Sequence, residues 1–261
     1  MLEIIPLPAF EDNYIWLLRN ALSNGVVVVD PGDETPVLDW LQSHAANYLA
    51  AILITHHHYD HVDGLPELLA AYPGIPVYGP SGRNAIAGVT HPVAEGDALS
   101  INGLDASFTV LEVPGHTADH IAYYAEDALF CGDTLFAGGC GRVFDGTLEQ
   151  LSDSLHRIAQ LPSQTRIYCG HEYTLANLGF AAWVEPESSA ITARIARERT
   201  RRAAGEPTLP SLLQVELETN PFLRTSEPGV KAAAERAAGT PLGSAGEIFT
   251  ALRQWKDRAY D

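Results

Sequence analysis

A histidine-rich segment, Thr55 to His61, is the part of the sequence most suited to chemistry. It reads Thr-His-His-His-Tyr-Asp-His and follows an apolar run that is typical of a buried strand. Side chains alternate along an extended chain, so His56 and His58 should point to the same side. Asp60 and His61 should begin a helix and face back, which would offer two pairs of ligands to two neighbouring ions. Imidazole and carboxylate suit zinc, manganese or iron, and the lack of thiolate argues against a structural zinc site.

Three more loops carry one ligand-type residue each, directly after an apolar strand and beside a glycine that lets the backbone come close. These residues are His116, Asp133 and His171, in Pro-Gly-His-Thr, Cys-Gly-Asp-Thr and Cys-Gly-His-Glu. Any one of them is explained equally well by a core or capping role, and a histidine tract alone can be a solvated or copper-binding segment. Four such loops in order along one chain favour a metal centre.

Three neighbours of these residues have roles that the sequence leaves less defined. His57 and Tyr59 should face away from the ligands and serve in packing or in holding ligands. Asp30, which opens the loop after an apolar strand, is either a hydrogen-bond acceptor for a ligand histidine or only a cap of its own loop.

The elements that must position these loops alternate between strands and helices, as expected of an α/β fold. Apolar runs of strand length are separated by turn signals and by helical patterns. The expected strands are 3–8, 14–19, 26–29, 49–54, 77–79, 99–101, 106–113, 121–124, 128–131 and 166–169, and the expected helices are 35–44, 62–72 and 148–161.

From residue 176 the pattern predicts helices only, so we place a domain boundary near residue 175. Residues 1–175 then form one domain and residues 176–261 a smaller helical domain. The expected parts of the second domain are a helix at 190–204 with Ser188 or Ser189 as its N-cap, a loosely packed connection at 225–245 and a final helix at 244–260.

Charge is distributed unevenly along the chain. The 261 residues include 16 basic and 33 acidic side chains, a formal net charge of -17. Residues 1–180 carry 5 basic and 22 acidic side chains, whereas residues 181–261 carry 11 of each. This excess of negative charge argues against nucleic acid and anionic membranes as partners. We interpret the arginine run between residues 194 and 202 as cations favoured by the dipole at the end of a helix.

The remaining composition indicates a cytosolic protein. No apolar run is long enough to span a bilayer, and the first residues have no basic region or cleavage site of a secretory signal. The three cysteines, Cys131, Cys140 and Cys169, are odd in number and are expected to be buried free thiols.

The order HxHxDH, PGHT, GDT, GHE resembles the signature of the metallo-β-lactamase superfamily. Within it, the sequence is most similar to the hydroxyacylglutathione hydrolases, or glyoxalase II, from about residue 5 to residue 258. The resemblance implies an α/β fold, an αββα sandwich with helices outside, followed by a smaller all-helical C-terminal domain. The motifs that single out this family include Asp12-Asn-Tyr-Ile, Gly132-Asp-Thr-Leu-Phe, Gly138-Gly-Cys-Gly-Arg, Asn220-Pro-Phe-Leu-Arg and Arg253-Gln-Trp-Lys.

For the site, the resemblance implies two divalent metal ions, with zinc expected and iron or manganese suited to the same ligands. The implied ligands are His56, His58 and His116 for one ion, Asp60, His61 and His171 for the other, and Asp133 as a bridge. A hydroxide between the ions is the expected nucleophile, with Asp60 and Asp133 as the catalytic residues beside it.

The substrate that the resemblance implies is S-D-lactoylglutathione, hydrolysed to glutathione and D-lactate. The residues implied to bind it are Arg142, Phe144, Tyr173, Arg253 and Lys256. Arg142 stands where the family usually has lysine, and Phe144 stands where it usually has tyrosine, which removes one hydroxyl. Arg253 and Lys256 lie three residues apart, so they share a helix face, and the resemblance implies that they bind the glycine carboxylate.

Two other functions stay open. A persulfide dioxygenase with a single iron shares the first motifs but lacks the helical C-terminal part. A non-catalytic scaffold, stabilised by metal, would instead use its acidic surface to bind a basic protein. For either enzyme we expect a monomer that acts on a small molecule, with neither nucleic acid nor membrane as a partner.

Overall fold

The computed structural model of the chain describes residues 2–21 and 23–260. Contacts divide it into two compact units. The first comprises Met1–Glu112 with Asp119–Gly132, and the second comprises Val113–Ala118 with Asp133–Asp261. The domain boundary near residue 175 stays a prediction.

The first unit contains a six-stranded sheet in the order β1-β2-β3-β4-β5-β6. The pairs β1/β2 and β2/β3 are antiparallel, and the pairs from β3 to β6 are parallel. Every residue of β3 is buried, as expected for an interior strand that is apolar on both faces. The bounds are β1 Leu2–Ala9, β2 Asn13–Asn20, β3 Gly25–Val29, β4 Tyr48–Leu53, β5 Val77–Pro80 and β6 His91–Val93.

Two helices, α1 (Thr35–Ser43) and α3 (Leu65–Ala71), cover one face of this sheet. Val37 of α1 and Leu68 of α3 belong to one buried cluster with Val28 and Ile52 of the central strands. Strand side chains alternate between faces, so this cluster includes only some of the buried residues of β3 and β4. The remaining buried residues of these strands face the opposite side of the sheet.

The helix expected at 62–72 is confirmed over Leu65–Ala71, but it begins three residues later than expected, after a separate short helix. A short α2 (Tyr59–Val62) ends before Gly64, and α3 begins with Pro66 in its first turn. Proline has no backbone N–H, and its ring would clash with the carbonyl of the residue four positions earlier, Val62. The break therefore separates the turn that carries Asp60 and His61 from the helix that packs on the sheet.

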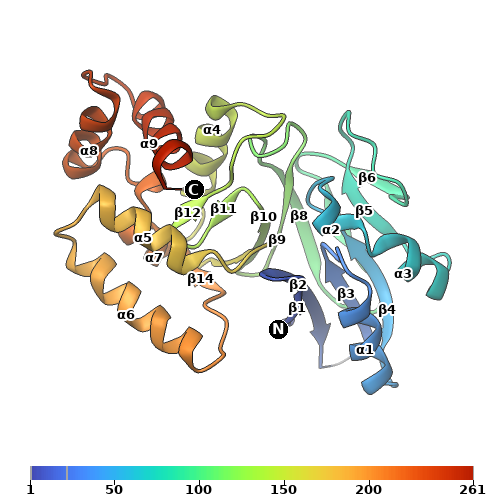
Figure 1. Cartoon of the computed structure of the whole chain (residues 1–261). Coiled ribbons are helices and arrows are strands. Elements are labelled where there is room, and N and C mark those ends of the chain that lie inside the picture. Colours follow the sequence, from blue (N-terminus) through green and yellow to red (C-terminus); the bar gives the residue numbers. More distant parts are fainter. Residues whose placement is uncertain (1, 22, 261) are drawn as a thin grey trace. The chain divides into compact units, whose positions relative to one another are not determined.

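A second group of strands in the first unit is antiparallel throughout: β7 (Ala98–Ser100), β8 (Ser107–Glu112), β9 (Ile121–Ala125) and β10 (Ala128–Gly132). Figure 1 shows these strands on the side of the first sheet away from α1 and α3. Tyr123 of β9 donates a hydrogen bond from its hydroxyl to the backbone oxygen of Ile54, just after β4, at 2.9 Å. Helices, sheet and sheet thus form successive layers.

The second unit is mainly helical. None of the helices that the structure describes is both long and apolar enough to cross a membrane. Its elements are β11 (Leu135–Phe136), β12 (Gly139–Cys140), α4 (Leu148–Ile158), β13 (Arg166–Cys169), α5 (Thr174–Val184), α6 (Ser189–Ala203), β14 (Ser211–Leu212), α7 (Leu213–Thr219), the 3₁₀ helix η1 (Pro221–Leu223), α8 (Pro228–Ala238) and α9 (Ala245–Ala259).

The helical character expected after residue 176 is confirmed with one exception, β14, which pairs with β13. Ser188 is confirmed as the N-cap of α6, since its hydroxyl accepts from the N–H of Ile191 at 3.3 Å. The loosely packed connection expected at 225–245 is wrong. It contains α8, an alanine-rich helix with Pro228 in its first turn and Gly239 as its C-cap, which buries Val230 and Ala234.

A buried ion pair joins α6 to α7. Arg194 donates to Glu216 Oε1, and Glu216 Oε2 accepts from the backbone N–H of Gly138 at 2.7 Å. Both side chains are buried. Arg194 is therefore a structural residue of the interior, whereas Arg201 and Arg202 occupy the last turn of α6, as interpreted from the sequence.

Glu216→Ala should lower the free energy of unfolding by about 3–5 kcal/mol, because the charge of Arg194 would stay buried without its carboxylate. Urea unfolding followed by tryptophan fluorescence measures the change. Arg197→Ala on the same helix is the control: its side chain is 55% exposed and pairs with Glu198, so it should cost no more than about 1 kcal/mol. Equal small losses in both variants would contradict the role of the buried pair.

Candidate metal centre

Four of the predicted ligands lie on the loop after β4 and in the first turns of α2. His58, the N-cap of α2, has an extended backbone with φ -63° and ψ 145°, so the alternation along the loop continues up to the helix. The ring of His56 lies 4.7 Å from the ring of His58 and 4.1 Å from the ring of His61, measured between centroids. The structure therefore gathers these imidazoles, as the spacing predicts.

The two intervening side chains behave differently from each other. His57 Nδ1 lies 3.8 Å from Asp119 Oδ1, away from the neighbouring ligands, as expected. Tyr59 is 69% exposed, so the packing role expected for it is wrong. The tyrosine begins α2, where the short helix has no neighbour to bury it.

One buried carboxylate, that of Asp30, organises the loop. Asp30 Oδ1 accepts from the N–H of Thr55 at 2.7 Å, and Oδ2 accepts from the Thr55 hydroxyl at 2.6 Å and from His61 Nδ1 at 3.0 Å. Because the Thr55 hydroxyl proton is committed to Asp30, its oxygen accepts from His56 Nδ1 at 3.0 Å. Both histidines thus carry their proton on Nδ1 and offer Nε2 to a metal ion. Of the two roles that the sequence left open, Asp30 has that of acceptor for a ligand histidine, and its carboxylate contacts the Thr55–His61 segment rather than its own loop.

Asp60 is oriented by Asn13, a residue whose role the sequence reasoning missed. Asn13 Nδ2 donates to Asp60 Oδ2 at 3.0 Å and to the Asp60 backbone oxygen at 3.3 Å. The signal that could have found it is its place in the Asp12-Asn-Tyr-Ile motif. Gly32 is required at the same place, since a Cβ there would overlap the carbonyl oxygen of Asp60.

His120 is a second missed residue. It is buried, and its ring stacks on that of His56 with centroids 4.5 Å apart and planes 18° apart. Its Nδ1 donates to the backbone oxygen of Ile121 at 3.0 Å. Gly132, with φ 47°, leaves room for this ring, because a Cβ there would come within 2.9 Å of His120 Nε2. No spacing in the sequence links His120 to the other histidines.

The second unit carries the other three predicted ligands. His116 Nδ1 donates to the backbone oxygen of Arg142 at 2.7 Å, which leaves Nε2 as its ligand atom. Asp133 Oδ2 lies 3.5 Å from His116 Nε2 and 3.3 Å from His171 Nε2. A single carboxylate between two imidazoles is the arrangement that a bridging ligand needs.

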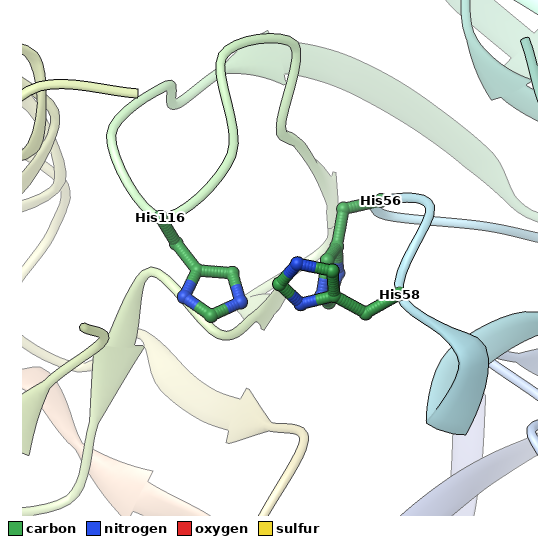
Figure 2. A group of neighbouring side chains, drawn as sticks. All are labelled: His56, His58 and His116. Carbon is green, nitrogen blue, oxygen red and sulfur yellow. The ribbon is translucent and has the colours of Figure 1, made fainter. Parts of the chain in front are cut away.

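The donor groups of each unit suit divalent transition ions. They are imidazole and carboxylate groups, and the Nδ1 atoms of His56, His61 and His116 are each held by a protein oxygen. Figure 2 shows the imidazoles of His56 and His58 on the loop after β4 and that of His116 on its own loop. Cysteine takes no part: burial raises the pKa of Cys140 to about 11 and of Cys169 to about 12, so both stay protonated near neutral pH.

Two predicted substrate residues lie beside ligand histidines of the second unit. Phe144, which is 64% exposed, sets its ring edge against His116 with centroids 5.2 Å apart. Tyr173 stacks on His171 at 4.7 Å with planes 5° apart. Both aromatic rings reach solvent and could therefore contact a bound ligand.

Two of the predicted cations, Arg142 and Arg253, contact the same aspartate. Arg253 Nη2 donates to Asp257 Oδ1 at 2.9 Å, and Arg142 Nε lies 3.5 Å from the same oxygen. Lys256 and Arg253 both lie on the buried face of α9, so the shared face predicted from their spacing is confirmed. Sequence reasoning missed Asp257, because the spacing says nothing of which anion the cations meet.

Two family models match the chain. One, described as the metallo-beta-lactamase superfamily, matches residues 10–171, and the other, described as the hydroxyacylglutathione hydrolase C-terminus, matches residues 172–259. A solved structure, ETHE1 from Myxococcus xanthus, aligns with a TM-score of 0.65 at 23% identity and covers 100% of this chain and 96% of its own, which shows the likeness of fold.

Full-length relatives share the same name. The hydroxyacylglutathione hydrolase of Alkalilimnicola ehrlichii is 52% identical over 99% of this chain and 100% of its own length. That of Aliivibrio fischeri is 50% identical over 98% of this chain and 99% of its own. The chain therefore belongs to the metallo-beta-lactamase superfamily and, within it, to the hydroxyacylglutathione hydrolase family.

Proposed function

We propose that this chain hydrolyses glutathione thioesters, with S-D-lactoylglutathione as its substrate, at a centre of two divalent metal ions. The observation that carries the proposal is the set of imidazole and carboxylate groups held in a ligating orientation by Asp30, Asn13 and the backbone of Arg142. Relatives named hydroxyacylglutathione hydrolase support the reaction. The family match over residues 172–259 favours it over a dioxygenase that lacks this part.

In this proposal the ions are zinc, and Asp133 is shared between them. The proposed ligands are His56, His58 and His116 for the first ion and Asp60, His61 and His171 for the second. Bound ions would supply an ionised water as the nucleophile and would polarise the thioester carbonyl. The near-equal distances from Asp133 Oδ2 to His116 and His171 support its shared role.

The protein's own part in the reaction is orientation. Asp30 and Thr55 keep Nε2 of two histidines available, and Asn13 holds the carboxylate of Asp60 in one direction. No general acid is assigned, because a thiol of pKa about 8.5 leaves readily as thiolate.

Substrate binding is assigned to exposed aromatic rings, one exposed arginine and two buried cations of the second unit. Tyr173 offers a hydroxyl beside His171, and Phe144 offers only its ring. The hydroxyl that Phe144 lacks would be worth about 0.5–1.5 kcal/mol as a hydrogen bond to glutathione. Glutathione has two carboxylates, and Arg142, Arg253 and Lys256 are the cations we assign to them. Residues 176–261 supply two of these cations and form the proposed substrate-binding domain.

Asp133→Asn should release metal and abolish hydrolysis of S-lactoylglutathione, because a neutral amide is a far weaker ligand than a carboxylate. We expect metal content to fall and activity to drop more than about 100-fold, beyond the usual effect of residues that only support ligands. Metal analysis and the loss of thioester absorbance, both on one preparation, measure the two quantities.

The control for this variant is His57→Ala, in the segment that carries four of the proposed ligands but turned toward Asp119. It should keep its metal and most of its activity. Full activity of Asp133→Asn, or equal metal loss in both variants, would show that the assignment of the ligands is wrong.

Lys256→Met should raise KM for the glutathione thioester about tenfold or more, with kcat and metal content little changed. Methionine keeps the apolar stem in the buried face of α9, so only the charge that binds a carboxylate is lost. Steady-state kinetics measure both parameters. Lys231→Met, which removes the half-exposed lysine of α8, is the matched control and should leave KM unchanged. A lowered kcat with unchanged KM would contradict the binding role of Lys256.

A further inference from the structure

Two arginines of the second unit converge on one carboxylate oxygen. Arg253 Nη2 donates to Asp257 Oδ1 at 2.9 Å, and Arg142 Nε lies 3.5 Å from that oxygen. Arg253 is fixed from its other side. Its Nη1 donates to the backbone oxygen of Cys140 at 3.1 Å, and its guanidinium lies 5.6 Å from the ring centroid of Phe222. The guanidinium is 1% exposed and cannot swing away without breaking these contacts.

Asp257 is more open than the arginine that it binds. Its side chain is 35% exposed, and that of Arg142 is 50% exposed, so the carboxylate lies where a ligand from solvent would meet the arginine pair. Around one native anion, the chain therefore places two of the three cations assigned to the substrate, Arg142 and Arg253.

A carboxylate of the substrate has the same chemistry as Asp257. To bind Arg142 and Arg253 it must replace Asp257 as their partner or share them with it, and sharing brings two like charges together. Either way, part of the binding free energy of the ligand is offset by the contact that Asp257 already makes.

We propose that Asp257 is a specificity-determining residue, a built-in competitor for the carboxylate subsite. It keeps the arginines paired in the free enzyme and weakens the binding of every carboxylate ligand. Simple carboxylates such as acetate then bind too weakly to compete, whereas glutathione, with a second carboxylate and a peptide backbone to contribute, still binds. This inference rests on the proposed function.

Asp257→Asn tests the inference, because it removes the charge and keeps the size of the side chain. In the metal-loaded enzyme, KM for S-lactoylglutathione and Kd for glutathione, measured by calorimetry, should both fall about two- to fivefold, the range that a partly exposed ion pair supports. Inhibition by acetate should strengthen, and kcat and metal content should stay unchanged. Asp257→Glu keeps the charge and should restore values near those of the natural enzyme.

An unchanged or raised KM in Asp257→Asn would overturn the inference, since Asp257 would then only orient Arg253. If circular dichroism shows that Asp257→Asn is misfolded, Asp257→Ser replaces it in the test, and the same fall in KM is expected. If the natural enzyme neither binds glutathione nor cleaves the thioester, the proposed function fails together with this inference. If it does both and Asp257→Asn binds no more tightly, only the inference fails.

Glu235→Gln is the matched control for net charge. Glu235 lies on α8 with its side chain 31% exposed and pairs with Lys231 at 3.9 Å. Its loss changes the total charge by the same amount as Asp257→Asn. KM should therefore stay within about twofold of the natural value, the scatter expected of surface charges. A fall equal to that in Asp257→Asn would assign the effect to long-range charge and overturn the local role of Asp257.

Discussion

The buried carboxylate of Asp30 is the interaction on which the arrangement of the first unit's histidines depends. It accepts hydrogen bonds from the backbone and hydroxyl of Thr55 and from His61. Because the Thr55 hydroxyl donates to Asp30, its oxygen accepts from His56, which determines that the His56 proton lies on Nδ1. A buried acceptor of this kind leaves each imidazole one available nitrogen. The left-handed backbone of Asp30, with φ 53°, places the carboxylate at the end of β3, beside the segment that follows β4. Asp30 therefore both connects the ends of two strands and orients the ligand histidines.

Electrostatics impose a second constraint. The first 180 residues hold the whole net charge of -17, and the proposed substrate is itself an anion. Attraction must therefore be local, from bound metal ions and from Arg142, Arg253 and Lys256. The contact between Asp257 and two of these cations moderates that attraction. Binding then depends on several weak contacts made at once, which favours a large dicarboxylate over small carboxylates.

The sequence predicted most strands, because periodicity is a local property. It also named seven candidate ligands from their loops, and their role as ligands stays a prediction. Prediction from the sequence failed where a structural feature depends on residues that lie far apart in the chain. Pro66 divided a helix that looked continuous, and the burial of Arg194 depended on a carboxylate in α7. Asn13 was missed as a supporting residue, since its partner Asp60 lies 47 residues away. Asp257 lies only four residues after Arg253, but its contact with Arg142 depends on the fold. Of the two roles left open for Asp30, its carboxylate has that of acceptor for a ligand histidine.

The central claim is that Asp30 holds the histidines ready for metal ions that hydrolyse a thioester. Asp30→Asn tests it, because an amide has only one accepting oxygen and would turn its NH2 group either toward the Thr55 N–H or toward the Thr55 hydroxyl and His61 Nδ1. We predict that this variant binds metal about 10- to 100-fold more weakly and regains S-lactoylglutathione hydrolysis when metal is added in excess. Two tightly bound metal ions and the natural rate without added metal would contradict the account.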